Sequence, residues 1–137
     1  MIRLPKEYLD EIIAHARAEA PYECGGVIAG LDGRAVKLYK VEGSNKSAMT
    51  YAAEPRANLR VMREVDDNDW TILALYHSHT HSQAYPSPTD VEVARAWMDS
   101  CHFIIVSLQH ADIPTIRAFR IADGEITEDE ITIGGKG

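Results

Sequence analysis

The middle of the chain reads WTILALYHSHTH over residues 70–81. Residues 70–76 form a nearly continuous apolar run, which is too short for a core helix and typical of a buried central strand. Three histidines follow at alternate positions, namely His77, His79 and His81. Because side chains alternate between the two faces of a strand, His77 and His79 point the same way. The stretch therefore predicts a central strand that ends in a pair of imidazoles.

Upstream of this strand, the sequence predicts a helix and a hairpin. Apolar residues recur at helical spacing over 9–20, between two prolines, and predict a first helix. Residues 24–30 predict a short buried strand, whose glycines permit close backbone approach. Asp32-Gly33 is a hairpin turn signal, and a second strand follows over 36–39.

Between the hairpin and the central strand, the sequence predicts a loop and a second helix. Residues 43–53 read as a loop that contains a short strand at 49–51. Pro55 opens the helix, whose far end is acidic over 64–69. Negative charge at a helix C-terminus opposes the helix dipole, so we expect this helix to stop early there.

Downstream of the histidines, a third helix and further strands are predicted. Residues 87–90 cap a helix that continues to residue 98, and residues 103–106 and 116–121 predict two strands. After the Asp123-Gly124 turn, a last strand runs through residues 126–133. This mixed order predicts one α/β (α+β) domain over residues 1–137, with helices packed on a mixed central sheet.

Composition excludes several classes of protein. The 137 residues suffice for about one domain, and 14 basic against 21 acidic residues give a net charge of −7. No basic stripe for nucleic acid is present. We expect no membrane span, no signal peptide and a cytoplasmic location. The two cysteines, Cys24 and Cys101, exclude a disulfide scaffold and a cysteine-rich zinc site. Cys24 as a nucleophile is disfavoured, because the adjoining carboxylate would raise its pKa.

The histidine pair and a nearby carboxylate predict a metal site. Asp90 lies in the first turn of the third helix and can reach the imidazoles of His77 and His79 if the intervening loop folds back. Two histidines and one carboxylate leave a fourth position for water, as in catalytic zinc (Zn2+) sites. Fe(II), Co and Mn suit the same ligands. The site also needs a proton shuttle, for which Glu23, just before the glycine-containing strand, is a candidate.

Two other interpretations of these residues stay open. The segment 87–90 fits a capping-box variant, in which Asp90 merely satisfies helix donors. In a shifted register, His79 and His81 would chelate the metal and Glu92 would supply the acid. Glu92 lies two residues further into the helix, so we prefer the first register.

The spacing of these residues resembles the JAMM (MPN+) metalloprotease family. Its pattern is Glu, then His-Ser/Thr-His, seven residues, Ser, two residues and Asp, and all five functional positions are present in order. The resemblance implies a fold similar to that of cytidine deaminases. It also implies that His77, His79 and Asp90 ligate zinc. Glu23 would act as general base and then as proton donor to the leaving amine, and Ser87 would polarise the scissile carbonyl and stabilise the oxyanion.

The residues around the motif indicate a branch and a substrate class. Family members often carry proline after the second histidine, where this chain has Thr80-His81. This difference predicts a looser loop, in which His81 could contact substrate or metal. Residues 23–26, Glu-Cys-Gly-Gly, resemble the compact bacterial and archaeal branch. That resemblance implies hydrolysis after the terminal Gly-Gly of a ubiquitin-like or sulfur-carrier protein. The enzyme would release cysteine, as in the Mec type, or a target lysine.

Three further points are left open by the sequence. The extended tail of the carrier would pair with a strand edge, which we expect near 49–51. A non-catalytic MPN scaffold and a hydrolase of small amides are the competing functions. The oligomeric state, a homodimer included, is not determined.

Overall fold

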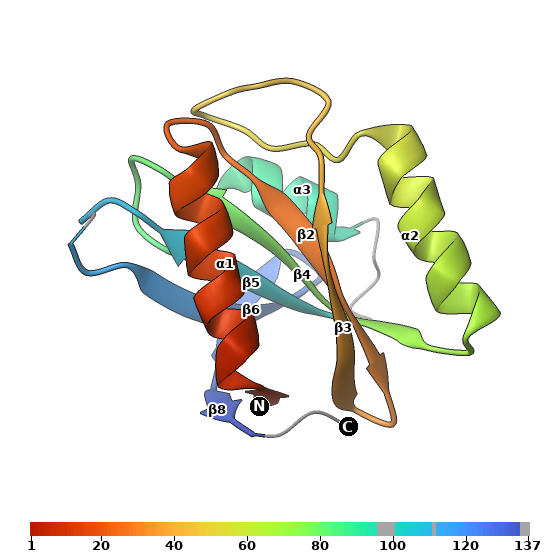
Figure 1. Ribbon diagram of the computed structural model, residues 1–137. Helices are drawn as coiled ribbons and strands as arrows, with labels where there is room; N and C mark the ends of the chain where they lie inside the picture. The colour runs from red at the N-terminus through yellow and green to blue at the C-terminus, as the bar shows by residue number, and fades with distance from the viewer. Residues whose placement is uncertain (96–100, 111, 135–137) are drawn as a thin grey trace.

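The predicted central strand, β4 (Thr71–His79), lies in the interior of a six-stranded sheet. The computed structural model of the chain describes residues 1–95, 101–110 and 112–134 (Figure 1). Along these residues the other elements are β1 (Ile2–Leu4), α1 (Lys6–Glu19), β2 (Gly25–Leu31), β3 (Arg34–Val41), α2 (Pro55–Asp67), α3 (Pro88–Arg95), β5 (His102–Ser107), β6 (Thr115–Ala122), β7 (Glu125–Asp129) and β8 (Ile131–Ile133).

The large sheet is mixed, as the sequence predicts. Its strand order is β3-β2-β4-β5-β6-β7. The β4–β5 pair is parallel and the other pairs are antiparallel. A parallel pair needs a crossover connection, which here contains α3. In the β2–β4 register Gly25 pairs with His77, so the start of β2 lies beside the histidine pair.

Helices cover both faces of the sheet and make an α+β fold (Figure 1). On one face α1 buries Tyr8, Ile12 and Ala16, which are spaced four residues apart, against side chains of the sheet that include Tyr76. On the other face α2 packs Val61 and Val65 against β2, and α3 packs Ala94 near Phe103. Each fully buried large apolar side chain contributes about 1.5–3 kcal/mol. No helix in the described part of the chain is long and apolar enough to cross a membrane.

Two expectations between residues 43 and 69 were wrong. No strand forms at 49–51, because the hydroxyl of Ser47 accepts hydrogen bonds from the backbone N–H groups of Met49 and Thr50 and folds the segment into a turn. The helix does not stop early but continues to Asp67. The acidic end is tolerated because Lys37 Nζ lies 2.6 Å from a carboxylate oxygen of Glu64 and because Val65 is buried.

The two chain ends also differ from the prediction. The last strand is divided at Glu130 into β7, on the edge of the large sheet, and β8, which pairs in parallel with β1. The strand β1, in which Ile2 and Leu4 are buried, was not predicted from the sequence. The expected extension of the third helix to residue 98 lies outside the described residues beyond Arg95.

Candidate functional site

The histidine pair lies on one face at the end of β4, as the alternation of the strand predicts. The two Nε2 atoms of His77 and His79 are 3.1 Å apart. The side chain of His77 is 17% exposed and that of His79 is 6% exposed. Two ring nitrogens so close together, both largely shielded from water, can share one cation.

Asp90 completes this group from the first turn of α3. Its Oδ1 lies 3.1 Å from Nε2 of His77, and its Oδ2 lies 3.1 Å from Nε2 of His79. Among the described residues, these three side chains form a group whose candidate ligand atoms all lie within 4.8 Å of one another. The loop between β4 and α3 therefore folds back as the metal-site hypothesis requires.

The donor set fits a zinc ion. Zinc–ligand bonds of about 2.0–2.1 Å in a tetrahedron place neighbouring ligand atoms about 3.3 Å apart. The two Nε2 atoms here are 3.1 Å apart, and each lies 3.1 Å from a different oxygen of the Asp90 carboxylate. Nδ1 of His79 donates to the carbonyl oxygen of Gln83 at 2.9 Å. That hydrogen bond turns Nε2 toward the cluster and makes it the ring nitrogen that can give its lone pair to a metal.

Asp90 also caps α3, so both interpretations of this residue fit the geometry. Its Oδ2 accepts from the backbone N–H of Ser87 at 2.8 Å, and its own backbone N–H donates to Oγ of Ser87 at 3.2 Å. This reciprocal arrangement fixes the carboxylate and holds Ser87 next to the cluster.

The electrostatics of the group favour cation binding. Burial alone would raise the pKa of Asp90, but hydrogen bonds from His77, His79 and the Ser87 backbone outweigh it and hold that pKa far below its usual range. Burial lowers the pKa of His79, and the contacts with Asp90 and with the Gln83 carbonyl reverse this shift and raise it. A proton therefore competes with a metal ion for this imidazole.

Glu23 lies immediately before β2, next to the histidine pair. Burial raises the pKa of Glu23, the charge of Asp90 adds to this shift, and the two histidines oppose it. The strands lock this arrangement in place. The backbone N–H of Cys24 donates to Oγ of Ser78 at 2.9 Å, and the backbone N–H of Ser78 donates to the Cys24 carbonyl at 2.8 Å. Ser78 is fully buried on the face opposite the histidines.

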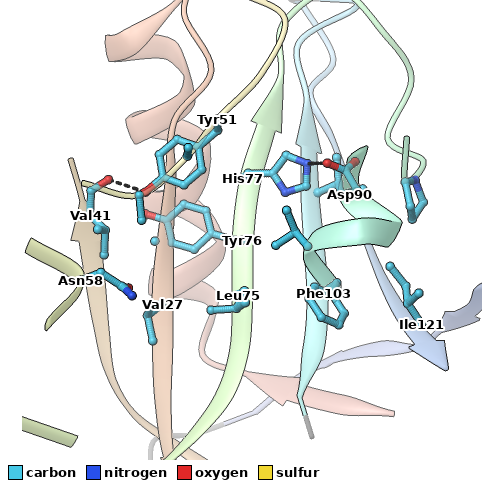
Figure 2. Close-up of a pocket in the computed structure, with 16 residues that line it drawn as sticks. Val27, Val41, Tyr51, Asn58, Leu75, Tyr76, His77, Asp90, Phe103 and Ile121 are labelled. Atoms are coloured by element: carbon cyan, nitrogen blue, oxygen red, sulfur yellow. Dashed lines mark hydrogen bonds and ion pairs between the residues drawn. The ribbon is translucent and has the colours of Figure 1, made fainter. Parts of the chain in front are cut away.

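Two cavities adjoin the site. The first, of about 280 Å³, has His77 and Asp90 in its wall and an otherwise largely apolar lining that includes Leu75 and Phe103 (Figure 2). The second, of about 460 Å³, is lined by Glu23 together with residues of α1 and of the segment after β3. The candidate base thus lines a different cavity from His77 and Asp90, and Val41 is in the wall of both cavities.

The shifted register and the cysteine nucleophile receive no support from the geometry. His81 is exposed and its Nδ1 contacts the hydroxyl of Thr80 at 2.9 Å. Glu92 pairs with Arg95 on the exposed side of α3. Cys24 is buried, and burial raises its pKa to about 11, so the thiol is protonated and a poor nucleophile.

Two residues that hold the site in position were not predicted from the sequence. Ser78 ties β4 to β2, and its signal was available, since the residue between two same-face histidines must point to the opposite face. Gln83 acts through its backbone carbonyl, to which any residue type contributes equally, so no sequence signal marks it.

Comparison with known proteins places this site in a family. Residues 5–122 match the family described as prokaryotic homologs of the JAB domain, which covers most of the chain. The chain belongs to this family. A protein of Mycobacterium tuberculosis named CysO-cysteine peptidase is 33% identical over 129 residues, which cover 93% of this JAB-family chain and 87% of the relative.

A second relative and a solved structure are also similar to this JAB-family chain. A protein of Thermus thermophilus named a probable TtuB-protein conjugate cleaving protease is 36% identical over 97 residues, covering 69% of this chain and 64% of that protein. The solution structure of DSY2949 from Desulfitobacterium hafniense superposes with a TM-score of 0.84 at 29% identity, covering 99% of this chain and 94% of that one.

Proposed function

We propose that this JAB-family chain is a zinc-dependent peptidase that cleaves the bond after the C-terminal Gly-Gly of a ubiquitin-like or sulfur-carrier protein. The observation that carries the proposal is the convergence of His77, His79 and Asp90 next to Glu23. The names of the two relatives, a CysO-cysteine peptidase and a TtuB-conjugate protease, support the peptidase activity and the carrier-protein substrate. A cytoplasmic location stays a prediction.

The ligands of the metal would be Nε2 of His77, Nε2 of His79 and the carboxylate of Asp90. When bound there, zinc lowers the pKa of a coordinated water to about 7 and polarises carbonyl groups. The hydrogen bond from His79 to Gln83 and the cap at Ser87 hold the ligands in orientation.

Glu23 carries the proton in this proposal. A carboxylate whose pKa is raised by burial is a better base near neutral pH than an exposed one. Glu23 accepts a proton from the attacking water while the water oxygen bonds to the carbonyl carbon. It then donates that proton to the amine nitrogen as the C–N bond breaks, so that a carboxyl group and a free amine leave.

Ser87 is suited to stabilise the oxyanion. Its Oγ accepts a hydrogen bond from the backbone N–H of Asp90 and keeps its own hydrogen to donate. The cap fixes this hydroxyl next to the ligand group without using that hydrogen. A preorganised donor of this kind is worth about 10²–10³ in rate.

We propose that the enzyme releases cysteine from a carrier adduct, in preference to isopeptide cleavage. The relative named for a cysteine adduct matches 93% of the chain, whereas the relative named for protein conjugates matches 69%. The discriminating experiment gives the zinc-loaded enzyme two substrates. One is a carrier protein ending in Gly-Gly-Cys, and the other is the carrier joined to a lysine side chain. The values of kcat/KM for the two substrates are compared.

The matched control is Glu23→Gln, which keeps the size of the side chain and leaves the three ligands intact. We expect it to bind zinc like the wild type and to lose about 10²–10⁴ in kcat. If the zinc-loaded wild type cleaves neither substrate, the proposed substrate class is wrong. If Glu23→Gln retains wild-type turnover, Glu23 is not the base.

A further inference from the structure

A loop over residues 43–54, hereafter the 43–54 loop, lies against the candidate site and has no role in the proposal above. Its two ends are joined by an isolated bridge between Gly43 and Ala53 and by a 2.8 Å hydrogen bond from the backbone N–H of Ser44 to the Ala52 carbonyl. The middle of the loop is thereby presented as a closed unit toward the start of β2 and the end of β4.

The middle of the loop bonds to residues on both sides of the site. The backbone N–H of Glu23 donates to the carbonyl of Ser47 at 2.7 Å. The hydroxyl of Thr80, the residue after His79, donates to the carbonyl of Ala48 at 3.3 Å. Glu23 precedes β2, so this contact from the loop fixes its backbone where the sheet no longer does.

Tyr51 anchors the same loop on the sheet. Its ring lies so close to Gly25 that a Cβ atom there would be 2.4 Å from Cε2 of the ring. Its hydroxyl donates to the carbonyl of Val41 at 2.7 Å, and the ring and His77 both lie at the first cavity (Figure 2). Gly25 pairs with His77 and follows Glu23 by two residues, so the ring packs on the backbone between the candidate base and the first histidine of the pair.

We propose that Tyr51 is a positioning residue, which clamps the 43–54 loop onto Gly25 so that the Ser47 carbonyl holds Glu23 in place. The inference rests on the proposed function, because it concerns the residue assigned there as general base. A catalytic group displaced by about 1 Å can cost about 10²-fold in rate. The clamp requires glycine at position 25, since any side chain there would push the ring away.

The first test replaces the clamp itself. In Tyr51→Ala we expect kcat to fall by about tenfold or more, with KM changed by less than about twofold and the zinc content unchanged. Amide hydrogen exchange of Glu23, measured with and without zinc, should become faster because the bond to Ser47 loosens. Tyr51→Phe keeps the ring on Gly25 and should recover most of kcat. Tyr39→Ala is the control, because it removes a half-buried tyrosine of β3 whose ring centroid lies 4.8 Å from Nζ of Lys37 and which makes none of the contacts described for Tyr51.

The second test uses the close contact. Gly25→Ala should lower kcat and loosen the Glu23 amide, and the double variant Gly25→Ala/Tyr51→Ala should be no worse than Tyr51→Ala alone, because both changes release the same clamp. Additive losses in the double variant would overturn the proposal. A Tyr51→Ala variant with unchanged kcat and unchanged Glu23 exchange would also overturn it. A variant in which only KM rises would overturn it as well, because the loop would then contact the substrate. If the wild type cleaves no carrier substrate, the exchange measurements still decide whether the clamp exists.

Discussion

At the scale of single residues, Asp90 takes part in two networks through one carboxylate. Both of its oxygens face a histidine nitrogen at 3.1 Å, and one of them also accepts from the Ser87 backbone. A helix cap and a metal ligand each restrict the side chain to one rotamer, and here the two restrictions coincide. The cap therefore preorganises the ligand before any ion binds.

We predict that Asp90→Ala and Ser87→Ala separate these two roles. Each removes a capping interaction and should lower the free energy of unfolding of the metal-free protein by about 1 kcal/mol. Asp90→Ala should also weaken zinc binding strongly, whereas Ser87→Ala should leave zinc binding near the wild-type level. Thermal unfolding and zinc titration of both variants check this, and equal zinc affinities for the two variants would contradict the ligand assignment.

The candidate ligand group was predictable from sequence because much of its geometry is local. His77 and His79 follow from the period of a strand, and Asp90 follows from its place at a helix start. The position of Glu23 beside them does not follow from spacing. It depends on the antiparallel register of β2 and β4 and on the Ser78–Cys24 bonds, which only the folded sheet reveals. In the sequence, Glu23 is a candidate only through its place before a glycine-containing strand and through the family resemblance.

At the scale of elements, the β2–β3 hairpin shows which turns the sequence determines. Asp32 and Gly33 both have positive φ, 51° and 78°, as do Asp123 and Gly124 between β6 and β7, at 51° and 79°. A two-residue turn that requires φ > 0 at both positions favours Asp-Gly, so both turns were predictable from the sequence. The turn at 49–51 was not, because its cause is a serine hydroxyl bonding to backbone two and three residues ahead.

Gly33→Ala tests this turn without disturbing any contact, because no atom lies within 4 Å of the added Cβ. We predict a loss of about 1 kcal/mol in the free energy of unfolding, which comes from the left-handed backbone alone. Asparagine tolerates this conformation better, so Gly33→Asn should lose less. Denaturant unfolding measures both, and an alanine variant as stable as the wild type would contradict the turn assignment.

At the scale of the whole molecule, a buried histidine outside the candidate ligand group joins three strands. Nδ1 of His102 on β5 lies 2.5 Å from a carboxylate oxygen of Asp129 on β7, and Nε2 lies 3.4 Å from Nη2 of Arg120 on β6. The amino group of Met1 also pairs with Asp129. Burial and the charge of Arg120 lower the pKa of His102, and the opposing effect of Asp129 is smaller. A neutral imidazole that donates to Asp129 and accepts from Arg120 fits this arrangement.

This histidine predicts how stability depends on pH. As the pH falls below about 6.5, the imidazole of the unfolded chain takes up a proton before that of the folded chain, so stability is lost toward acid. The stabilising contribution is complete above that pH. Denaturant midpoints between pH 5 and 8 should therefore decline toward pH 5 less steeply in His102→Gln than in the wild type. Identical slopes would show that His102 titrates alike in both states.

The β1–β8 pair was beyond the sequence analysis because it joins the two ends of the described chain in parallel. Its register, Ile2 with Ile131, is set by the packing of Ile2 and Leu4 under α1 and not by any local pattern. The central sheet, by contrast, contains apolar strands that the runs of apolar residues predict. The order of helices and strands around it was predicted from these runs.

The zinc content of the purified protein tests the proposed metal centre most directly. It is measured for the wild type and for the His77→Ala/His79→Ala variant, after equilibration with zinc and removal of excess ion. We predict one zinc per chain in the wild type and none in the variant, while circular dichroism shows the same fold in both. A wild type that retains no zinc, or a folded variant that still holds one ion per chain, would contradict the claim that these side chains form the metal centre.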